Sequence, residues 1–287
     1  MNNILDVNGL TKTYKTGKGI KDISFNLEKG TILGIIGLNG AGKSTLISCL
    51  TGALKKEDGK INYSFEDGKN KIDHATLNHL GVVGSDYGFP GHFSANTVNR
   101  VMKKGYTNWD SDKFFDILKI LDLDTKLKAK KYSTGMKTKL AIAVALSHNA
   151  KILILDEATR GLDIKASSAI RKVLSKHVES GENSIIMTSH IMGEIERMSD
   201  TIMLIDEGQK TIHLNKDDLL YTHKIFEVTS GQMSTIDKAD ILKLRRDDYN
   251  TKIIAKDARF FEEKYGVESS NSGLESIIEL LLEGEGA

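Results

Sequence analysis

The sequence predicts an α/β fold, in which apolar strands alternate with helices around a buried sheet. Three observations support this prediction. The run Thr31–Ile36 is apolar and β-branched, which is typical of a buried strand. A glycine-rich stretch follows it, and Thr45–Leu50 then places its apolar residues on one helical face. A second apolar run, Ile152–Leu155, ends in two neighbouring carboxylates, Asp156 and Glu157.

Composition sets the outer limits of the interpretation. With 287 residues the chain can form one large domain or two small ones. Its net charge of +1 argues against nucleic acid as the main partner. The single cysteine, Cys49, excludes an internal disulfide, fits a reducing compartment and is expected to be a packed core thiol. The N-terminus lacks a signal-peptide pattern and no apolar run approaches a membrane helix, so we expect another chain to supply any membrane-spanning part.

The glycine-rich stretch matches the phosphate-binding motif G-x-x-x-x-G-K-[ST]. Its residues are Gly37, Leu38, Asn39, Gly40, Ala41, Gly42, Lys43, Ser44 and Thr45. The motif lies between a strand and a helix, as its chemistry requires, because glycines let backbone amides point inward and the helix start adds unpaired amides. We expect Lys43 to reach the β- and γ-phosphates and the Ser44 hydroxyl to bind Mg²⁺. An ordinary glycine turn is the disfavoured alternative.

Two later strands end in residues suited to hydrolysis. At the tip of the first, Asp156 can hold the Mg²⁺ shell and Glu157 can take a proton from an attacking water. The second strand is Ser184–Thr188, and His190, just beyond it, could donate a hydrogen bond to a γ-phosphate. A solvated acidic pair is the usual alternative, but an apolar strand aimed at a phosphate loop favours the functional interpretation.

Three further features have two interpretations on the residues alone. Tyr14 could stack on a purine base or could simply be a sheet tyrosine. Ser133 and Gly135 precede a helix expected over 137–148, so they form either a second anion-binding helix start or a plain cap. Asn70–Asp73 spells N-K-x-D, but it comes only 30 residues after Lys43, and we interpret it as a solvated turn.

The rest of the chain is expected to fall into recognisable parts. Residues 3–30 resemble antiparallel strands, and residues 92–148 form a helical insertion, with Asp110 or Ser111 as a cap and Trp109 as a core anchor. A helix is expected over 165–179, and Ile202–Ile205 is expected as an edge strand that closes a domain spanning 1–210.

Residues 215–287 are expected to form a smaller α/β extension. Strands are expected at 225–228 and 252–255 and a helix at 259–265, joined by charged connectors. The last helix carries an apolar stripe made of Leu274, Ile277, Ile278, Leu281 and Leu282. This stripe packs either on the extension itself or against a dimer mate or another partner.

The ordered set of motifs resembles the ATPase subunit of an ABC transporter over residues 3–210. The resemblance implies a P-loop NTPase (RecA-like) core with an antiparallel β subdomain and a helical insertion, which binds ATP and Mg²⁺. It implies that Tyr14 stacks on adenine and that Gly37–Thr45 is the Walker A loop. Asp156 and Glu157 match Walker B and the catalytic base. Ser133 and Gly135 match the signature that grips the γ-phosphate bound by the other subunit. Asp163 matches the D-loop aspartate, and His190 matches the switch histidine.

The resemblance also implies partners. Two ATPase subunits, as a homodimer or a heterodimer, bind head to tail, and a separate transmembrane permease holds them at the cytoplasmic face of the membrane. The Trp109–Asp110 pair, the signature and the leucine-rich tail are similar to bacterial two-component exporters of peptides or antibiotics, including phenol-soluble-modulin exporters. The alternatives are a soluble ABC ATPase that acts on nucleic acid or ribosomes, and a degenerate cassette that binds ATP without hydrolysing it.

The sequence departs from the family pattern in three places. The signature, usually L-S-G-G-Q, is Tyr-Ser-Thr-Gly-Met over Tyr132–Met136. Ser85 or Asp86 replaces the Q-loop glutamine, so Ser85 is the candidate Mg²⁺ ligand at that position. Ala158 stands where a proline usually follows the catalytic glutamate.

Overall fold

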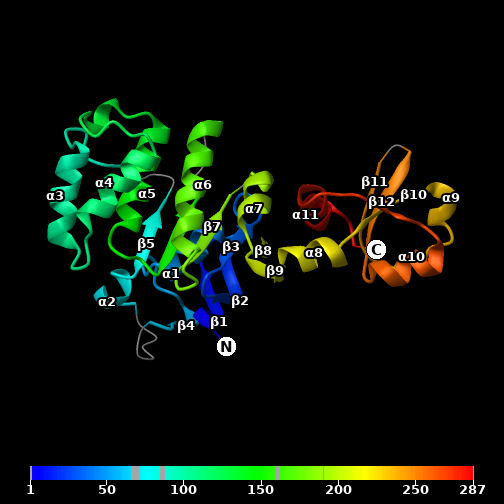
Figure 1. Ribbon diagram of the computed structural model, residues 1–287. Coiled ribbons are helices and arrows are strands. Elements are labelled where there is room, and N and C mark those ends of the chain that lie inside the picture. The colour runs from blue at the N-terminus through cyan, green and yellow to red at the C-terminus, as the bar shows by residue number, and fades with distance from the viewer. Residues whose placement is uncertain are drawn as a thin grey trace. The chain divides into compact units, whose positions relative to one another are not determined.

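The computed structural model describes residues 2–65, 72–84, 88–158, 162–189, 191–247 and 249–286 (Figure 1). The chain divides into two compact units. The first comprises Met1–His190 and Met198–His213, and the second comprises Ile191–Arg197 and Leu214–Ala287. The assignment of residues 1–210 and 215–287 as two functional domains stays a prediction.

A three-stranded antiparallel sheet begins the first unit, as predicted for residues 3–30. Its strands are β1 (Asn3–Thr13), β2 (Gly19–Glu28) and β4 (Asp58–Tyr63), in the order β2-β1-β4. Strand β1 pairs antiparallel with both neighbours. Apolar side chains alternate with polar ones along β2, because one face of the sheet is buried and the other is not.

A six-stranded sheet forms the centre of the first unit, in the order β5-β6-β7-β3-β8-β9. Its strands are β3 (Ile32–Ile36), β5 (Leu80–Val83), β6 (Ile152–Asp156), β7 (Ser184–Thr188), β8 (Thr201–Asp206) and β9 (Gln209–Asn215). The first five strands in this order are parallel. The prediction of an edge strand at Ile202–Ile205 was wrong, because the polar strand β9 covers β8 and carries no apolar pattern that the sequence could show.

The helices of the first unit connect these strands. They are α1 (Lys43–Leu50), α2 (His74–Leu77), α3 (Ala95–Gly105), α4 (Ser111–Ile120), α5 (Thr134–Leu146) and α6 (Ile164–Val178), with a 3₁₀ turn at Ala129–Lys131. Helices α3, α4 and α5 gather beside β5 and form the predicted helical insertion (Figure 1). Asp110 caps α4, as expected, and Trp109 contacts Phe114 at 5.3 Å between ring centroids. Helix α5 begins at Thr134, three residues earlier than expected.

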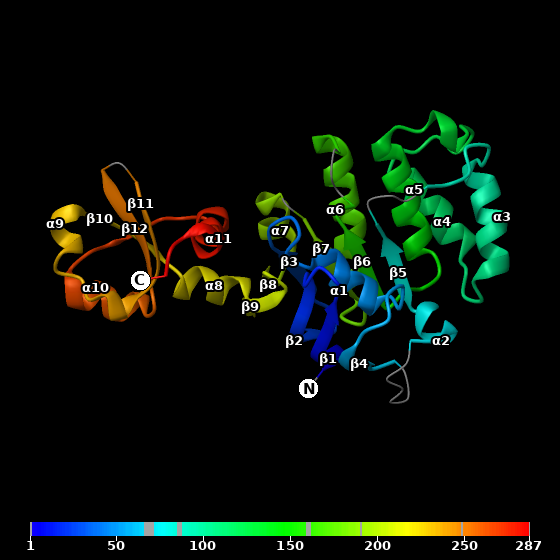
Figure 2. The same cartoon turned by 180° about the vertical axis from the view of Figure 1, so that it is seen from behind.

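One hydrophobic core joins the two sheets and α1, which lies beside β2 (Figure 2). Leu5, Phe25, Leu46 and Ile154 all belong to it. Cys49 is 2% exposed within this core, which confirms the packed thiol. Burial raises the pKa of this thiol.

The second unit contains a four-stranded antiparallel sheet in the order β11-β12-β10-β13. Its strands are β10 (Ile225–Thr229), β11 (Ile241–Arg246), β12 (Asn250–Ala255) and β13 (Ser269–Ser270); its helices are α8 (Lys216–Thr222), α9 (Ser230–Met233), α10 (Ala258–Tyr265) and α11 (Leu274–Glu283), and the 3₁₀ turn Lys238–Asp240 precedes β11. Helix α7 (Met192–Met198) falls mainly in this unit. Strand β11 lies in a stretch that was expected to be a charged connector.

The apolar stripe of α11 packs on the second unit itself. Helix α11 contacts β11 and β12, and Leu274, Ile277 and Ile278 are at most 1% exposed. The first of the two interpretations of this stripe is therefore confirmed. Among the described residues, no helix has the length and apolar character needed to cross a membrane.

Candidate active site

The loop between β3 and α1 has the backbone shape that a phosphate cradle requires. Gly40 and Gly42 have φ angles of 86° and 111°, which side-chain-bearing residues rarely adopt. A side chain at Gly37 would place its Cβ 2.4 Å from the carbonyl oxygen of Ile205. These glycines therefore allow a tight loop over the end of β8 that opens directly into the first turn of α1.

Lys43 lies inside this loop rather than in solvent. Its side chain is 7% exposed, and Nζ donates hydrogen bonds to the carbonyl oxygens of Gly37 (2.6 Å) and Leu38 (3.1 Å). Burial lowers the pKa of Lys43, while the nearby carboxylates of Glu157 and Asp156 raise it. The ammonium group therefore lies within electrostatic reach of both predicted catalytic carboxylates.

The other loop residues differ in exposure. Asn39, Gly40 and Ser44 are exposed, and Thr45 is half-buried. Ala41 is buried, and its carbonyl accepts a hydrogen bond from the amide of Gly208 at 3.0 Å. Through this hydrogen bond, the turn between β8 and β9 stabilises the phosphate loop. The Ser44 side chain stays accessible to solvent.

Asp156 and Glu157 are held by a residue on the neighbouring strand. The Thr188 hydroxyl donates to Asp156 Oδ1 at 2.7 Å and accepts from the backbone amide of Glu157 at 3.0 Å. The same amide also lies 3.2 Å from the Thr188 carbonyl oxygen. Glu157 has a φ angle of 50°, so the chain turns sharply where β6 ends.

The order of the strands explains why these groups meet. Strand β7 lies between β6 and β3, and all three are parallel. The carboxyl end of β3 leads into the phosphate loop, and the carboxyl end of β6 carries the two carboxylates. Both groups therefore face the same edge of the sheet, which is the usual place for ligands in open α/β sheets.

Comparison with known proteins agrees with this geometry. A family model described as ABC transporter matches residues 20–160. The "Uncharacterized ABC transporter ATP-binding protein YcbN" of Bacillus subtilis is 32% identical over 225 residues, which are 76% of this chain and 72% of that protein. The chain belongs to the ABC transporter family. It is accordingly an ATPase subunit that binds ATP with Mg²⁺ and hydrolyses ATP.

Two further similarities extend the comparison. The "Bacitracin transport ATP-binding protein BcrA" of Bacillus licheniformis is 32% identical over 245 residues, 84% of this chain and 79% of that one. The solved structure of cbiO1 from Clostridium perfringens, described as part of the ABC transporter complex cbiONQ, has a TM-score of 0.63 at 26% identity and covers 77% of this chain and 92% of that chain. This similarity supports the predicted P-loop NTPase fold.

The donors near the phosphate loop suit the Mg²⁺ ion that an ABC ATPase uses. Mg²⁺ in such sites takes one or two carboxylates together with phosphate oxygens and waters. Asp156 offers one carboxylate and Ser44 an accessible hydroxyl. Within the described ranges, no group of three or more histidine, cysteine, aspartate or glutamate residues could hold a metal without phosphates. Ser85, the third predicted ligand, lies outside the described residues, as does Asp86.

Tyr14 lies at the end of β1, in a turn that returns to β2. The Tyr14 amide donates to the Lys18 carbonyl at 2.8 Å, and the side chain is 46% exposed. The turn approaches the phosphate loop, because a Cβ at Gly42 would lie 2.9 Å from the Gly19 carbonyl oxygen. An exposed aromatic ring in this turn is compatible with base stacking, which stays a prediction.

The signature residues lie at the start of α5 of this ABC ATPase. Ser133 is exposed and caps the helix by accepting a hydrogen bond from the Met136 amide at 3.2 Å. A Cβ at Gly135 would lie 3.2 Å from Leu162, and Asp163, the next residue, caps α6. The signature and the D-loop aspartate are thus close neighbours. Among the described contacts, no hydrogen bond connects them to the phosphate loop of the same chain.

Some predicted residues lie outside the part of the chain that the structure describes, and one residue of the site was not predicted. His190 lies outside the described residues, as do the first two residues of the N-K-x-D stretch. Asp73, the last residue of that stretch, caps α2 through the amides of Ala75 and Thr76, so it serves a local turn. Sequence reasoning missed Thr188. The usable signal was a hydroxyl residue at the end of an apolar strand parallel to the one that carries Asp156.

Proposed function

We propose that this ATPase drives export of a peptide, an antibiotic or another amphipathic molecule through a separate membrane-spanning permease. The name of the bacitracin transport relative supports this substrate class, and its similarity spans 84% of this chain. With no spanning helix among the described residues, we place the subunit at the cytoplasmic face of the membrane, held there by the permease.

One arrangement carries the proposed mechanism: the loop that buries the ammonium of Lys43 and the strand end that carries Asp156 and Glu157 face the same edge of the sheet. We assign Lys43 to the β- and γ-phosphates. These phosphates lose water when they bind, and the positive charge of the ammonium group stabilises their negative charge in its place. Bound Mg²⁺ supplies charge neutralisation on the phosphates. Ser44 and Asp156 hold it.

Glu157 is assigned as the base that accepts a proton from the attacking water. Its backbone amide is fixed by Thr188, so the carboxylate is directed by the turn at the end of β6. His190 and Ser85 are proposed to contact the γ-phosphate and the metal ion, respectively. Tyr14 is assigned to the adenine ring.

The working unit is proposed to be a head-to-tail pair of cassettes, either identical or closely related. Ser133 and Gly135 begin a helix at an exposed surface beside Asp163, and they would grip the γ-phosphate bound by the partner subunit. ATP then favours the closed pair because only the closed pair makes this contact. The helical insertion passes the movement to the permease.

Glu157→Gln tests the assignment of the base. The variant is expected to bind ATP with unchanged affinity, to hydrolyse it roughly 10²–10⁴-fold more slowly, and to remain as a dimer with ATP. Glu182→Gln is the matched control, because Glu182 precedes β7 at the opposite edge of the sheet and pairs only with Lys29 at 3.4 Å among the described residues. Wild-type turnover in purified Glu157→Gln would exclude the assigned role.

Affinity capture from a native membrane extract tests the transport assignment. A membrane-spanning protein is expected to co-purify, and ATPase activity should rise when both are reconstituted in vesicles with the exported compound. Capture of ribosomes or nucleic acid without a membrane protein would instead support a soluble ABC ATPase. ATP binding with no turnover in the reconstituted complex would support the degenerate cassette.

A further inference from the structure

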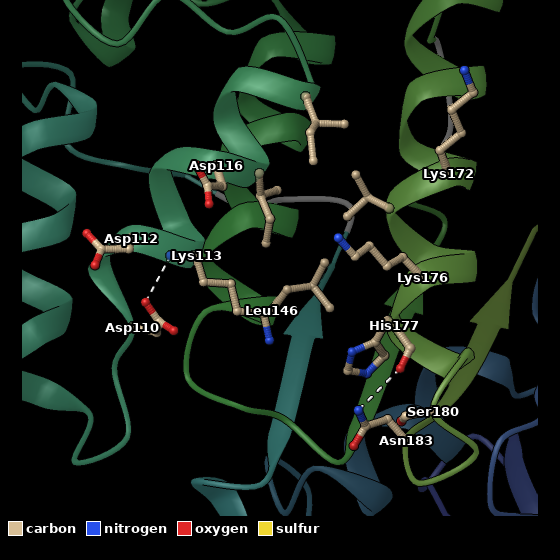
Figure 3. A pocket seen from close by; sticks show the side chains of 13 residues that line it. Asp110, Asp112, Lys113, Asp116, Leu146, Lys172, Lys176, His177, Ser180 and Asn183 are labelled. Atoms are coloured by element: carbon tan, nitrogen blue, oxygen red, sulfur yellow. Dashed lines mark hydrogen bonds between the residues drawn. The ribbon is translucent and has the colours of Figure 1, made fainter.

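A cavity of about 660 Å³ lies between α4 and α6, with the end of α5 at its floor (Figure 3). This volume is within the range of small-molecule sites. Its described lining includes none of the residues assigned to ATP, Mg²⁺ or the partner subunit. The cavity is therefore a separate feature of the first unit, distinct from the site of ATP hydrolysis.

The apolar part of the lining is aliphatic. It consists of Ile117 and Ile120 on α4, Leu146 at the end of α5, and Val173 on α6. Leu146, Ile117 and Val173 are buried, whereas Ile120 lies at the rim and is 48% exposed. Since the described lining contains no Phe, Tyr or Trp, and His177 is its only ring, the cavity suits a flexible hydrocarbon chain better than a flat ring that would stack.

His177 lines the cavity, and one polar atom of its ring lacks a hydrogen-bond partner in the part of the chain that the structure describes. The side chain is 8% exposed, and its buried Nε2 has no hydrogen-bond partner among the described residues. Asn183 lies nearby but donates to the backbone carbonyl of His177, at 3.2 Å, and not to the ring (Figure 3). Buried polar atoms are rarely left without a partner, so the ring has capacity for a ligand atom.

The ring of His177 is neutral at physiological pH. Burial lowers its pKa to about 4, with smaller contributions from the positive charges of Lys113, Lys151 and His148. A neutral imidazole carries one N–H, and as the Nε2 tautomer it donates a hydrogen bond to a carboxylate or phosphate oxygen.

Positive charge faces the interior of the cavity. Figure 3 shows Lys113 reaching from α4 past Leu146 and Lys176 extending from α6 into the space between the helices. Lys113 is half-buried, and burial lowers its pKa, while Asp110 raises it. Neither lysine forms an ion pair with a residue that the structure describes, and Lys113 only approaches Asn149, at 3.5 Å. Lys176 is exposed, whereas the half-buried Lys113 has only Asp110 as a nearby opposite charge among the described residues, and Asp110 is engaged as the cap of α4. A half-buried ammonium in this situation favours an anionic ligand.

Negative charge lies farther out. Asp112 and Asp116 are exposed on α4, where water and salt screen them, and Asp110 is engaged as the cap of α4. Lys172 and Lys176 are exposed on α6 in the same way, so these outer charges of opposite sign balance one another, while the inner wall contributes the half-buried Lys113 and the imidazole. The distribution disfavours a cationic ligand inside the cavity.

We propose that this cavity binds a single-chain aliphatic anion, which is a medium-chain alkyl group with one carboxylate or phosphate. The anionic head lies between Lys113 and Lys176 beside the ring of His177, whose buried Nε2 donates to it once the ring turns toward the cavity. The alkyl chain lies along Ile117, Leu146 and Val173. The carboxylate and the phosphate share the same recognition chemistry, and the experiment separates them.

Isothermal titration calorimetry of the full chain tests the site with four ten-carbon probes below their micelle concentrations: decanoate, decyl phosphate, decanol and decylamine. At least one anion is expected to bind one-to-one, and the stronger of the two identifies the head group. Decanol and decylamine should bind at least roughly tenfold more weakly, because they lack the charge that the lysines attract. Binding of decanol as tight as that of the stronger anion, or no binding of either anion, would overturn the proposal.

A charge-removal variant locates the site. The double variant Lys113→Met/Lys176→Met keeps the aliphatic stems and is expected to weaken binding of the stronger anion at least roughly tenfold, with binding of decanol unchanged. Lys119→Met is the matched control, because Lys119 is exposed on α4 and does not line the cavity. Unchanged anion binding by the folded double variant would contradict the proposal.

A measurement on the unmodified protein covers the case in which the double variant does not fold. The ¹⁵N resonances of the His177 imidazole, assigned by comparison with His177→Gln, should shift when the anion is added and should saturate with the same affinity as the calorimetric titration. An unshifted His177 signal under saturating decanoate and decyl phosphate would overturn the assignment.

Discussion

Two helices of the first unit begin at sites assigned to phosphate, and they satisfy their first backbone amides differently. The N-cap residue of helix α1 is Gly42, with a φ angle of 111°, and no side chain of the described chain caps this helix. The N-cap residue of helix α5 is Ser133, whose hydroxyl accepts a hydrogen bond from the Met136 amide. A helix start leaves about four amides without intrahelical partners. The first amides of α1 therefore need a ligand as their hydrogen-bond partner, whereas the Ser133 hydroxyl already accepts from one of the first amides of α5.

The lysines of the two helix starts show the same difference. Lys43, the first residue of α1, is 7% exposed and bonded within the phosphate loop. Lys137, in the first turn of α5, is exposed. At the start of α1, the buried ammonium of Lys43 lies where phosphates are expected. At the start of α5, the lysine is exposed and Ser133 caps the helix. We infer that an isolated subunit binds nucleotide through the first site alone and uses the second only when it pairs.

Lys43→Met should separate the two sites most clearly. We expect ATP affinity to fall roughly 100-fold, about 2.7 kcal/mol, because a charge-assisted contact to the phosphates is lost. The melting temperature without nucleotide should not fall, because the variant also removes the cost of burying an ammonium. Titration with a fluorescent ATP analogue and thermal unfolding measure both quantities.

Lys137→Met is the control for this prediction, because it removes a lysine from the equivalent turn of α5. It should leave the affinity of the isolated subunit unchanged. A similar loss of affinity in both variants would show that the two helix starts contribute alike and would remove the distinction between them.

Thr188→Val disturbs the first site without touching the phosphate loop. It removes the hydroxyl that donates to Asp156 and accepts from Glu157. The Mg²⁺ concentration for half-maximal ATPase activity should rise roughly 10–100-fold, because partners that orient metal ligands typically have effects of this size. Unfolding should become easier by about 1–3 kcal/mol, since Thr188 is 1% exposed and its partners are left less satisfied.

The conservative variant Thr188→Ser keeps the hydroxyl and should restore the Mg²⁺ dependence. If Thr188→Val loses stability but keeps the wild-type Mg²⁺ dependence, then Thr188 supports the fold and does not position Asp156.

Ser133→Ala tests the self-capped site. Loss of the cap should destabilise the subunit by about 1 kcal/mol. Nucleotide affinity of the isolated subunit should not change, whereas ATPase activity at concentrations that favour pairing should fall. Ser133→Thr should retain the cap and recover stability. A Ser133→Ala variant with full ATPase activity would show that the hydroxyl acts only as a cap.

The contrast between the two sites also shows what the sequence could predict. The phosphate loop, Asp156 and Glu157 were predictable, because each sits in a local pattern of strand, turn and helix. The proximity of Gly135 to Leu162 was not, because it depends on how the start of α5 packs against the residues before α6, with β6 between them in the chain. Strand β9 was missed because its residues are mostly exposed and lack the alternation that marks a half-buried strand.

Thr188 illustrates a further limit. Its role depends on strand order, because β7 lies beside β6 and aligns Thr188 with Asp156. A threonine at a strand end has no specific sequence signature. By contrast, the apolar stripe of α11 correctly predicted burial, although only the structure showed that β11 and β12 cover it.

Glu57 provides a third way to satisfy a backbone amide, and it is one that pH can switch. Its carboxylate accepts from the Thr13 amide (3.0 Å), the Thr13 hydroxyl (2.8 Å) and Lys12 Nζ (3.0 Å), next to Tyr14 at the end of β1. These bonds, led by that of the Thr13 amide, lower the pKa of Glu57 from 4.5 to about 2. Because the folded pKa is depressed, the stabilisation is complete above pH 4.5 and is lost as the pH falls toward 2.

Glu57→Gln should therefore melt at a slightly lower temperature than the wild type near neutral pH, and the difference should shrink as the pH falls below 4.5. Lys12→Met is the control, because it removes only the ion pair and leaves both Thr13 bonds. If the backbone amide is the dominant partner, Lys12→Met keeps most of the acid dependence. If Lys12→Met abolishes the acid dependence, the lysine is the dominant partner of the carboxylate, and the Glu57 contact is an ordinary surface ion pair. Melting curves of the three proteins from about pH 7 to about pH 3 distinguish these outcomes.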